Sequence, residues 1–470
     1  MSWLQQRLAA LRQDLVRLRT PGSFLRNALF TSADAAVNIS LQLVFTPILA
    51  RIYSPEAYGV FGLYTSITNN LSNVAVLGFP LAFSLPREEG VFHALVRCTW
   101  WLLVVSTLLT LPVFLFPSLL YAVFPSWSIM GDWCMAVPWM VFVIGVAQIM
   151  IAWYNRAKAF GAFARTNMLT NLSLRITNLS FGLGVPGLPG LLVSETLVRT
   201  AVIALYVKDL GKHGVDRVLR SVPARDMRTA ALAYKEYPLY IFPSRWLNLL
   251  ALQLPIYGLV GLGLENASGQ FTMAGALLLM PLRMFGYSLY GVFLRRAIEA
   301  GPEKPAELAD ITRRMYQRLL LFGMVPIMGI TFFADVVLRF ALGDQWGAAG
   351  VFTALLGPFY LFRLLSEPLS AVFIALRNER SLFIFNLLVF VGSALAVLIG
   401  NHWPKDPTPM VALFGGINAL VYFGLSARVL HATGSPWLNL SLRTLAFSAL
   451  AAIFFAGIRW WLFGSLWPGG

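Results

Sequence analysis

Residues 381–401, SLFIFNLLVFVGSALAVLIGN, form an apolar run without a charged side chain. A helix needs about 20 such residues to cross the roughly 30 Å of hydrocarbon in a bilayer. Thirteen runs of this kind can be read along the chain, and we predict an all-α polytopic membrane protein with about 12–14 transmembrane helices. The predicted spans are 24–49, 58–85, 94–116, 134–154, 163–183, 188–208, 237–262, 268–297, 316–338, 349–376, 381–401, 408–430 and 443–464.

The composition favours the same class. Hydrophobic residues make up 58% of the 470 residues and charged residues only 12%, whereas a soluble domain carries about 25% charged residues. Residues 117–133 leave two alternatives open, a surface helix or part of an extra span. Pro117 and Pro125 favour the surface helix, because proline interrupts helical hydrogen bonding.

The basic residues predict the orientation. The net charge is +15, and assigning alternate connections to opposite sides puts 27 of the 36 lysines and arginines on one face. Only Arg51, Arg339, Lys405 and Arg459 fall on the other face. Because positive residues concentrate on the cytoplasmic side, the amino terminus is predicted to be cytoplasmic. The charge is thereby explained without nucleic acid as a partner.

The predicted domains follow from one long basic connection. Residues 1–22 interleave leucines with arginines at helical spacing, which favours an amphipathic helix on cytoplasmic membrane lipids over a frayed tail. Residues 23–210 and 237–432 each hold six predicted spans, with 211–236 as the basic cytoplasmic linker. Residues 433–470 add one carboxyl-terminal helix. We expect no metal, cofactor or disulfide, because the two cysteines and four histidines are scattered.

A weak internal repeat relates the two groups of spans. Residues 58–61, YGVF, open the second span after a first span that contains Pro47. Residues 268–271, SGQF, open the eighth after a seventh that contains Pro255. Internal repeats of this kind are common in transporters.

Several segments resemble the Wzx-type polysaccharide flippases of the multidrug/oligosaccharidyl-lipid/polysaccharide exporter superfamily. The clearest is residues 50–64, ARIYSPEAYGVFGLY, and the resemblance covers nearly the whole chain without a catalytic signature. The other segments are 77–80 (LGFP), 85–89 (LPREE), 254–256 (LPI), 269–271 (GQF), 281–282 (PL) and 375–380 (ALRNER).

The resemblance implies two six-helix lobes around a central cavity that opens alternately to either side, as in MATE transporters. It implies a flippase of the bacterial inner membrane, which moves an oligosaccharide on undecaprenyl diphosphate to the periplasmic leaflet. The product would serve a cell-surface polysaccharide such as O-antigen. A polysaccharide polymerase and a chain-length regulator would be its partners.

Five arginines lie inside predicted spans, where a charge costs about 2.5–3.5 kcal/mol and needs a partner, water or a function. Glu195 precedes Arg199 by four residues and Arg363 precedes Glu367 by four, so both pairs can form on one helix face. The other three, which have no acid at three or four residues, are Arg175, Arg245 and Arg283.

These three arginines are the predicted contacts for the diphosphate, because a guanidinium binds planar oxygens bidentately and keeps its charge. Arg245 could instead snorkel to lipid phosphates from near the end of its span. Asparagines and serines also recur at helical spacing on four spans, which predicts a wet cavity, although any single asparagine could simply bond a neighbouring helix. The predicted polar lumen comprises Arg175, Arg245, Arg283, Arg363, Asn38, Asn69, Asn73, Asn248 and Tyr287.

The acids inside spans are candidates for coupling transport to a proton or sodium gradient. They are Asp34, Glu195 and Glu367. The alternative functions are a cation-coupled small-molecule exporter of the same superfamily, a flippase for the peptidoglycan lipid precursor, and a membrane polymerase or ligase. The three arginines without an acid three or four residues away favour an anionic cargo over a cationic drug, and the short connections disfavour an enzyme.

Overall fold

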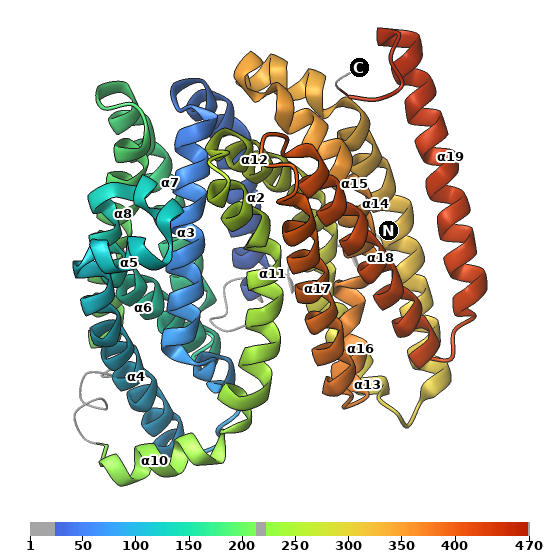
Figure 1. Cartoon of the computed structure of the whole chain (residues 1–470). Helices are drawn as coiled ribbons and strands as arrows, with labels where there is room; N and C mark the ends of the chain where they lie inside the picture. The colour runs from blue at the N-terminus through green and yellow to red at the C-terminus, as the bar shows by residue number, and fades with distance from the viewer. Residues whose placement is uncertain (1–23, 213–221, 469–470) are drawn as a thin grey trace, which may run out of the picture. The chain divides into compact units, whose positions relative to one another are not determined.

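The computed structural model describes residues 24–212 and 222–468, with side chains except at 24–32, 212, 287, 288 and 379. The described residues form helices joined by short turns and loops, and no strand occurs among them. The predicted surface helix at 1–22 lies outside the described residues. Residues 213–221 of the predicted linker, 211–236, also lie outside them. Contacts group the described helices into two compact units (Figure 1).

Unit 1 comprises the described parts of Met1–Ile52, Ile67–Ala122 and Gly131–Phe242. Within it α6 packs against α4, α7 and α8, while α2 packs along α7 and α10 lies across the end of α4 (Figure 1). The elements that belong wholly to this unit are α2 (Phe24–Ile52), η1 (Phe79–Ala82), α4 (Glu89–Leu115), α6 (Val137–Arg156), α7 (Phe160–Gly184), α8 (Leu188–Lys212), α10 (Ala224–Ala233) and η3 (Tyr237–Ile241).

Unit 2 comprises Tyr53–Ser66, Val123–Met130 and Pro243–Gly470, of which 469 and 470 are not described. Helix α15 forms its centre, packed against α12, α14 and α18, and α19 lies along α14. Its elements are α11 (Phe242–Gly261, from Pro243 on), α12 (Glu265–Pro281), η4 (Leu282–Tyr287), α13 (Ser288–Ala300), α14 (Pro305–Leu342), η5 (Asp344–Trp346), α15 (Gly347–Ser366), η6 (Pro368–Ser370), α16 (Ala371–Ala375), α17 (Glu379–Gly400), α18 (Thr408–Ala432) and α19 (Trp437–Phe463).

Besides α11, whose first residue Phe242 belongs to unit 1, three elements contribute residues to both units: α3 (Pro55–Val76), α5 (Pro117–Val123) and η2 (Pro125–Ala136). The last two occupy the ambiguous stretch at 117–133. It forms a short helix and a 3₁₀ segment that kinks at Gly131, whose φ is 53°. It is therefore not a continuous span.

Each of the thirteen predicted spans contains a helix. Within the described ranges, nine helices are long and apolar enough to cross a membrane, and a tenth span forms if α12 and α13, bent by 44°, count as one. The remaining three predicted spans, α3, α7 and α11, are helices of 22, 25 and 20 residues. They are less apolar because they carry the asparagines, serines and arginines of the predicted lumen. The predicted lobe boundaries stay a prediction.

The segments of the predicted repeat pack against each other within unit 2. A Cβ atom on Gly59 would lie 2.0 Å from the carbonyl oxygen of Glu265, and one on Gly269 would lie 1.9 Å from that of Pro55. The side chain of Asn266 also donates a hydrogen bond to Glu56. Glycine is required at both positions because the two backbones are in contact.

One arginine of the predicted outer face makes a buried ion pair. Arg459, assigned from the sequence to the outer face, is only 3% exposed and lies against α14. Its Nη2 donates to Oδ2 of Asp335 at 2.6 Å and its Nη1 to Oδ1 at 2.8 Å. The apolar run placed Arg459 near the end of its span, but its partner lies 124 residues away and could not be read from local spacing.

Candidate functional site

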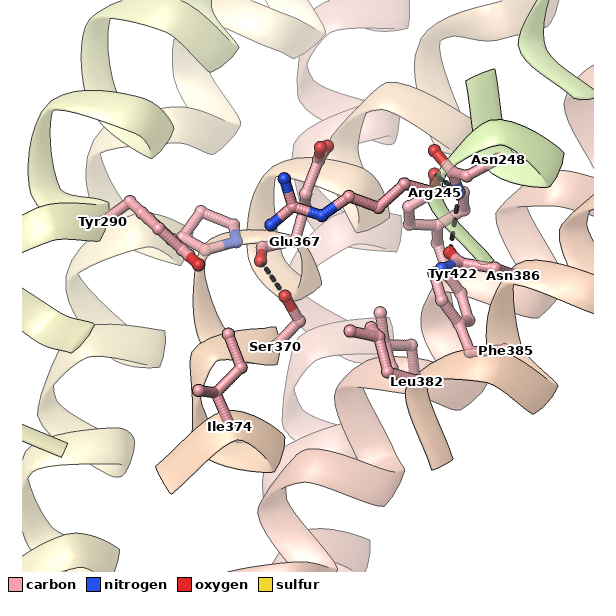
Figure 2. Close-up of a pocket in the computed structure, with 12 residues that line it drawn as sticks. Arg245, Asn248, Tyr290, Glu367, Ser370, Ile374, Leu382, Phe385, Asn386 and Tyr422 are labelled. Carbon is pink, nitrogen blue, oxygen red and sulfur yellow. Dashed lines mark hydrogen bonds between the residues drawn. The ribbon is translucent and has the colours of Figure 1, made fainter. Parts of the chain in front are cut away.

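A cavity of about 290 Å³ lies inside unit 2, among α11, α13, α16, α17, α18 and η6 (Figure 2). Charged and polar side chains line one part of it, and apolar side chains line the rest. The lining residues are Arg245, Asn248, Tyr290, Glu367, Pro368, Ser370, Ile374, Leu382, Phe385, Asn386, Tyr422 and Leu425. The cavity can therefore hold a small molecule or part of one that has both polar and apolar groups.

A chain of amide hydrogen bonds joins three helices at the cavity wall. Nδ2 of Asn248 on α11 donates to Oδ1 of Asn386 on α17 at 3.1 Å, and it lies 3.5 Å from the hydroxyl of Tyr422 on α18. Nδ2 of Asn386 donates in turn to Oγ of Ser244 at 2.9 Å. These bonds satisfy polar groups that would be costly in hydrocarbon, and they hold Asn248 at the cavity.

Arg363 and Glu367 form the ion pair that their spacing predicts. Nε of Arg363 donates to Oε2 of Glu367 at 2.6 Å. Arg363 is 8% exposed, and its guanidinium carbon lies 5.9 Å from the ring centre of Phe359 and 5.8 Å from that of Tyr360. Glu367 is half-buried and lines the cavity, so this pair joins a buried cation to an accessible carboxylate.

Arg245 is exposed and extends from α11 into the cavity toward Glu367 (Figure 2). Among the residues that the structure describes, it has no ion pair and no hydrogen bond through its side chain. It lines the cavity together with Asn248 and Tyr290. A cation in such a place is available to an anionic ligand.

Arg283 lies where the helix pair α12 and α13 is broken. The π-helical segment η4 follows Pro281, and Arg283 is its second residue. The side chain is exposed, and within the described parts of the chain it makes no ion pair or hydrogen bond. Irregular helix in a membrane span is tolerated where it lines a cavity or packs on protein, and π segments are frequent at functional sites. Tyr287 ends the same segment, but its side chain is not described.

A second polar cluster lies in unit 1, where α2 meets α7. Asp34 is buried, and Nδ2 of Asn167 donates to both its oxygens, at 3.0 Å and 2.8 Å. Nδ2 of Asn38 donates to Oδ1 of Asp34 at 2.9 Å. The carboxylate therefore has three amide bonds, and no lysine or arginine within 4.0 Å among the described residues. This environment suits a group that exchanges a proton or a small cation.

The other predicted residues of unit 1 do not join one site. Asn69 and Asn73 bond along α3, where Nδ2 of Asn73 donates to the carbonyl oxygen of Asn69 at 2.8 Å. Glu195 pairs with Arg199 on α8 as predicted. Arg175 is half-buried on α7. The structure thus brings together Arg245, Asn248 and Glu367 in one cavity, and Asp34 with Asn38 in another cluster.

Asn386 and Tyr422, which take part in the hydrogen bonds at the cavity wall, were not predicted. Asn386 is the single amide in the middle of the apolar run at 381–401, and a lone polar group in such a run is a signal for an interior contact. Tyr422 carries no comparable signal. In the described ranges, no cluster of three or more His, Cys, Asp or Glu side chains could hold a metal ion.

A family model described as "Polysaccharide biosynthesis protein" matches residues 48–350. Stage V sporulation protein B of Bacillus subtilis is 21% identical over 464 residues, covering 92% of this chain and 87% of that protein.

Two solved structures resemble the fold. An inward-facing multidrug resistance MATE family transporter of the MOP superfamily has a TM-score of 0.60 at 14% identity, covering 85% of this chain and 98% of its own. The lipid II flippase MurJ in an inward closed conformation has a TM-score of 0.57 at 14% identity, covering 93% and 99%. The predicted MATE-like fold is therefore confirmed.

Proposed function

Because the chain belongs to the family of polysaccharide biosynthesis proteins and is a multi-pass helical membrane protein, we propose that it is a flippase for undecaprenyl-diphosphate-linked oligosaccharides. It moves these units by alternating access from the cytoplasmic to the periplasmic leaflet of the bacterial inner membrane. The observation that carries the proposal is Arg245, a cavity-lining guanidinium with no ion pair or hydrogen bond among the described residues. A diphosphate supplies the charge and the planar oxygens that such a group binds.

The charge balance around the cavity supports an anionic cargo. Arg245 lines the cavity with a single carboxylate, Glu367, which is itself paired with Arg363, and all three residues are in unit 2. A cavity for cationic drugs would need an excess of acids or aromatic faces over cations. The small-molecule exporter is therefore the weaker candidate, although a MATE family transporter shares the fold.

The side chains of Asn248, Asn386 and Tyr422 at the cavity wall support the proposal that a sugar binds next to the phosphate. Amides and a phenol offer both donors and acceptors, which hydroxyl groups of a glycan can use. The apolar side chains of Ile374 and Leu382 at the same cavity suit the first isoprene units. The cavity holds only the part of the cargo near the diphosphate, because about 290 Å³ is too small for a whole lipid-linked oligosaccharide.

Asp34 is the proposed coupling residue. Its carboxylate is held by amides alone among the described side chains, whereas Glu195 and Glu367 are each paired with an arginine. Binding of a proton or sodium ion to Asp34 would change its bonds to Asn167 and so the contact between α2 and α7. Transport by Asp34→Asn should lose its dependence on an imposed ion gradient, and an unchanged dependence would contradict the assignment.

The test is a flipping assay with purified protein in proteoliposomes. Undecaprenyl-diphosphate-linked oligosaccharide is placed in the inner leaflet, and its arrival outside is followed by a membrane-impermeant glycosidase or lectin. Wild type should accelerate its transfer, Arg245→Gln should not, and Arg225→Gln on the exposed face of α10 should behave as wild type. Faster transfer of the peptidoglycan lipid precursor, or of cationic dyes, would overturn the assignment in favour of those cargoes.

The glycan and the partners are addressed in cells. Deletion of the gene should cause a particular undecaprenyl-linked saccharide to accumulate in the inner leaflet, and its analysis identifies the glycan. The proposed partners are a polysaccharide polymerase and a chain-length regulator, because flipped units must be polymerised outside. Cross-linking in the native membrane should recover them with this protein.

A further inference from the structure

The cavity of unit 2 holds two opposite charges. Among its described lining residues, Arg245 is the one cation and Glu367 the one carboxylate. Figure 2 shows the guanidinium of Arg245 reaching across the cavity toward Glu367. Both charges also act electrostatically on Tyr290, which lines the same cavity. A ligand bound at Arg245 therefore comes under the influence of Glu367.

Glu367 is anchored by a buried arginine. Its Oε2 accepts from Nε of Arg363 at 2.6 Å, and Arg363 is buried beside the rings of Phe359 and Tyr360. The side chain of Glu367 remains 30% exposed, against 9% for that of Arg363. The ion pair thus fixes a carboxylate at the cavity wall while its cation stays out of reach of most ligands.

We propose that Glu367 is a specificity-determining residue that competes with the cargo's phosphate for Arg245, and thereby weakens anion binding enough for release. This inference rests on the proposed function. A phosphate near Arg245 is attracted by the guanidinium and repelled by the carboxylate, and both effects are stronger in a partly dehydrated cavity than in water. A carrier also needs binding that is favourable enough for entry and weak enough for exit.

The same arrangement explains how an anion site can sit in a membrane protein before the cargo arrives. Glu367 offsets part of the positive charge of Arg245 and Arg363 when the cavity holds only water. When a phosphate enters, it binds Arg245, while the bond of Glu367 to Arg363 keeps the carboxylate at the cavity wall. Removing its charge should therefore strengthen anion binding, while removing Arg245 should weaken it.

The experiment measures anion binding to the purified full-length chain in nanodiscs by isothermal titration. The probes are inorganic pyrophosphate and farnesyl diphosphate, whose comparison separates the phosphate from the isoprenoid contribution. Glu367→Gln should bind both about tenfold more tightly, and Arg245→Gln about tenfold more weakly. Glutamine keeps an oxygen that can accept from Arg363. Glu299→Gln is the matched control, since Glu299 pairs with Arg295 four residues away on an exposed face.

A second pair of variants covers the case in which Glu367→Gln disturbs folding. Ser370 lines the cavity one turn from Glu367, and its Oγ donates to the carbonyl oxygen of that residue at 2.7 Å. Ser370→Asp adds a carboxylate without touching the ion pair, and Ser370→Asn has nearly the same shape without the charge. The aspartate variant should bind pyrophosphate about tenfold more weakly than the asparagine variant.

The outcomes separate this inference from the proposed function. If Arg245→Gln weakens binding but Glu367→Gln leaves it unchanged or weakens it too, the role of Glu367 is overturned and the anion site stands. Equal binding by Ser370→Asp and Ser370→Asn would overturn it in the same way. If wild type binds neither probe, or binds them independently of Arg245, the proposed function falls together with the inference.

Discussion

Unit 2 contains two arginine sites that differ in how completely nearby carboxylates neutralise the charge of the guanidinium. At the first, Arg459 meets both oxygens of Asp335 and also donates to the carbonyl oxygen of Phe332 at 2.6 Å, and it is almost fully buried. At the second, Arg363 pairs with Glu367, whereas Arg245 lines the cavity without an ion pair among the described residues. The ion pair of Arg459 with Asp335 holds α19 to α14. The charge of Arg245, which has no ion pair among the described residues, is available to a ligand.

The largest effect on stability is expected at the paired site. Arg459→Met leaves the carboxylate of Asp335 buried without its cation, which costs about 3–5 kcal/mol in soluble proteins. Thermal unfolding in detergent should show a large drop in Tm. The double variant Asp335→Asn with Arg459→Met should recover most of it, and Lys405→Gln at an exposed position should change nothing. A wild-type Tm for the single variant would remove the basis of the comparison.

A smaller loss is expected at the ion pair beside the cavity. Arg363→Met removes the partner of Glu367, but this carboxylate is partly exposed and can be hydrated. The cost should be about 1–3 kcal/mol, the range for losing a charged hydrogen bond. The same unfolding measurement applies, with Arg295→Met at the exposed pair on α13 as the control. A loss as large as that of Arg459→Met would show that the cavity pair is also structural.

The amide chain should contribute less again. Asn386→Leu removes its bonds to Ser244 and Asn248, and interhelical bonds of this kind average about 0.6 kcal/mol each. We expect a loss of about 1 kcal/mol, with weaker binding of a glycan-bearing diphosphate but unchanged binding of pyrophosphate. Asn401→Leu, at the exposed end of the same helix, is the control. Equal loss for both probes would assign Asn386 to the phosphate rather than to the sugar.

The smallest effect on stability, and a large one on transport, is expected for Arg245→Gln. The side chain is exposed to the cavity and makes no ion pair among the described residues, so unfolding should change by less than about 0.5 kcal/mol. Flipping should fall roughly tenfold to a hundredfold, as for loss of a charged contact worth about 1.5–3 kcal/mol. Arg245→Lys should be intermediate, because lysine keeps the charge without the planar fork.

The helices of this protein were predictable because the bilayer demands them. The run at 381–401 became α17, Glu379–Gly400, and each other predicted span also contains a helix. The ends were less predictable. Residues 58–85 were predicted as one span, but α3 ends at Val76, before Leu77 and Gly78 take positive φ values of 47° and 71°. Apolar composition continues past that turn, so hydropathy alone does not reveal where the backbone stops being helical.

The site was predictable only where its residues are neighbours along one helix. The pairs Arg363 with Glu367 and Glu195 with Arg199 follow from a spacing of four residues, which brings two side chains onto one helix face. Arg245 and Arg283 were singled out because no acid lies within a turn of either. Asn386 was missed, because its contact with Asn248 spans 138 residues and leaves no periodic pattern.

The order of residues along the chain was sufficient to predict a membrane-spanning helical protein, its orientation from the distribution of charge, and the arginines that need an explanation. These follow from hydrocarbon thickness, helix geometry and the cost of charge in lipid, which are all local or averaged properties. Packing between distant helices decided that Arg459 is buried with Asp335 while Arg245 faces a cavity with Asn248 and Glu367. Both are arginines in apolar surroundings, and what separates them is the set of side chains that neighbouring helices bring within bonding distance.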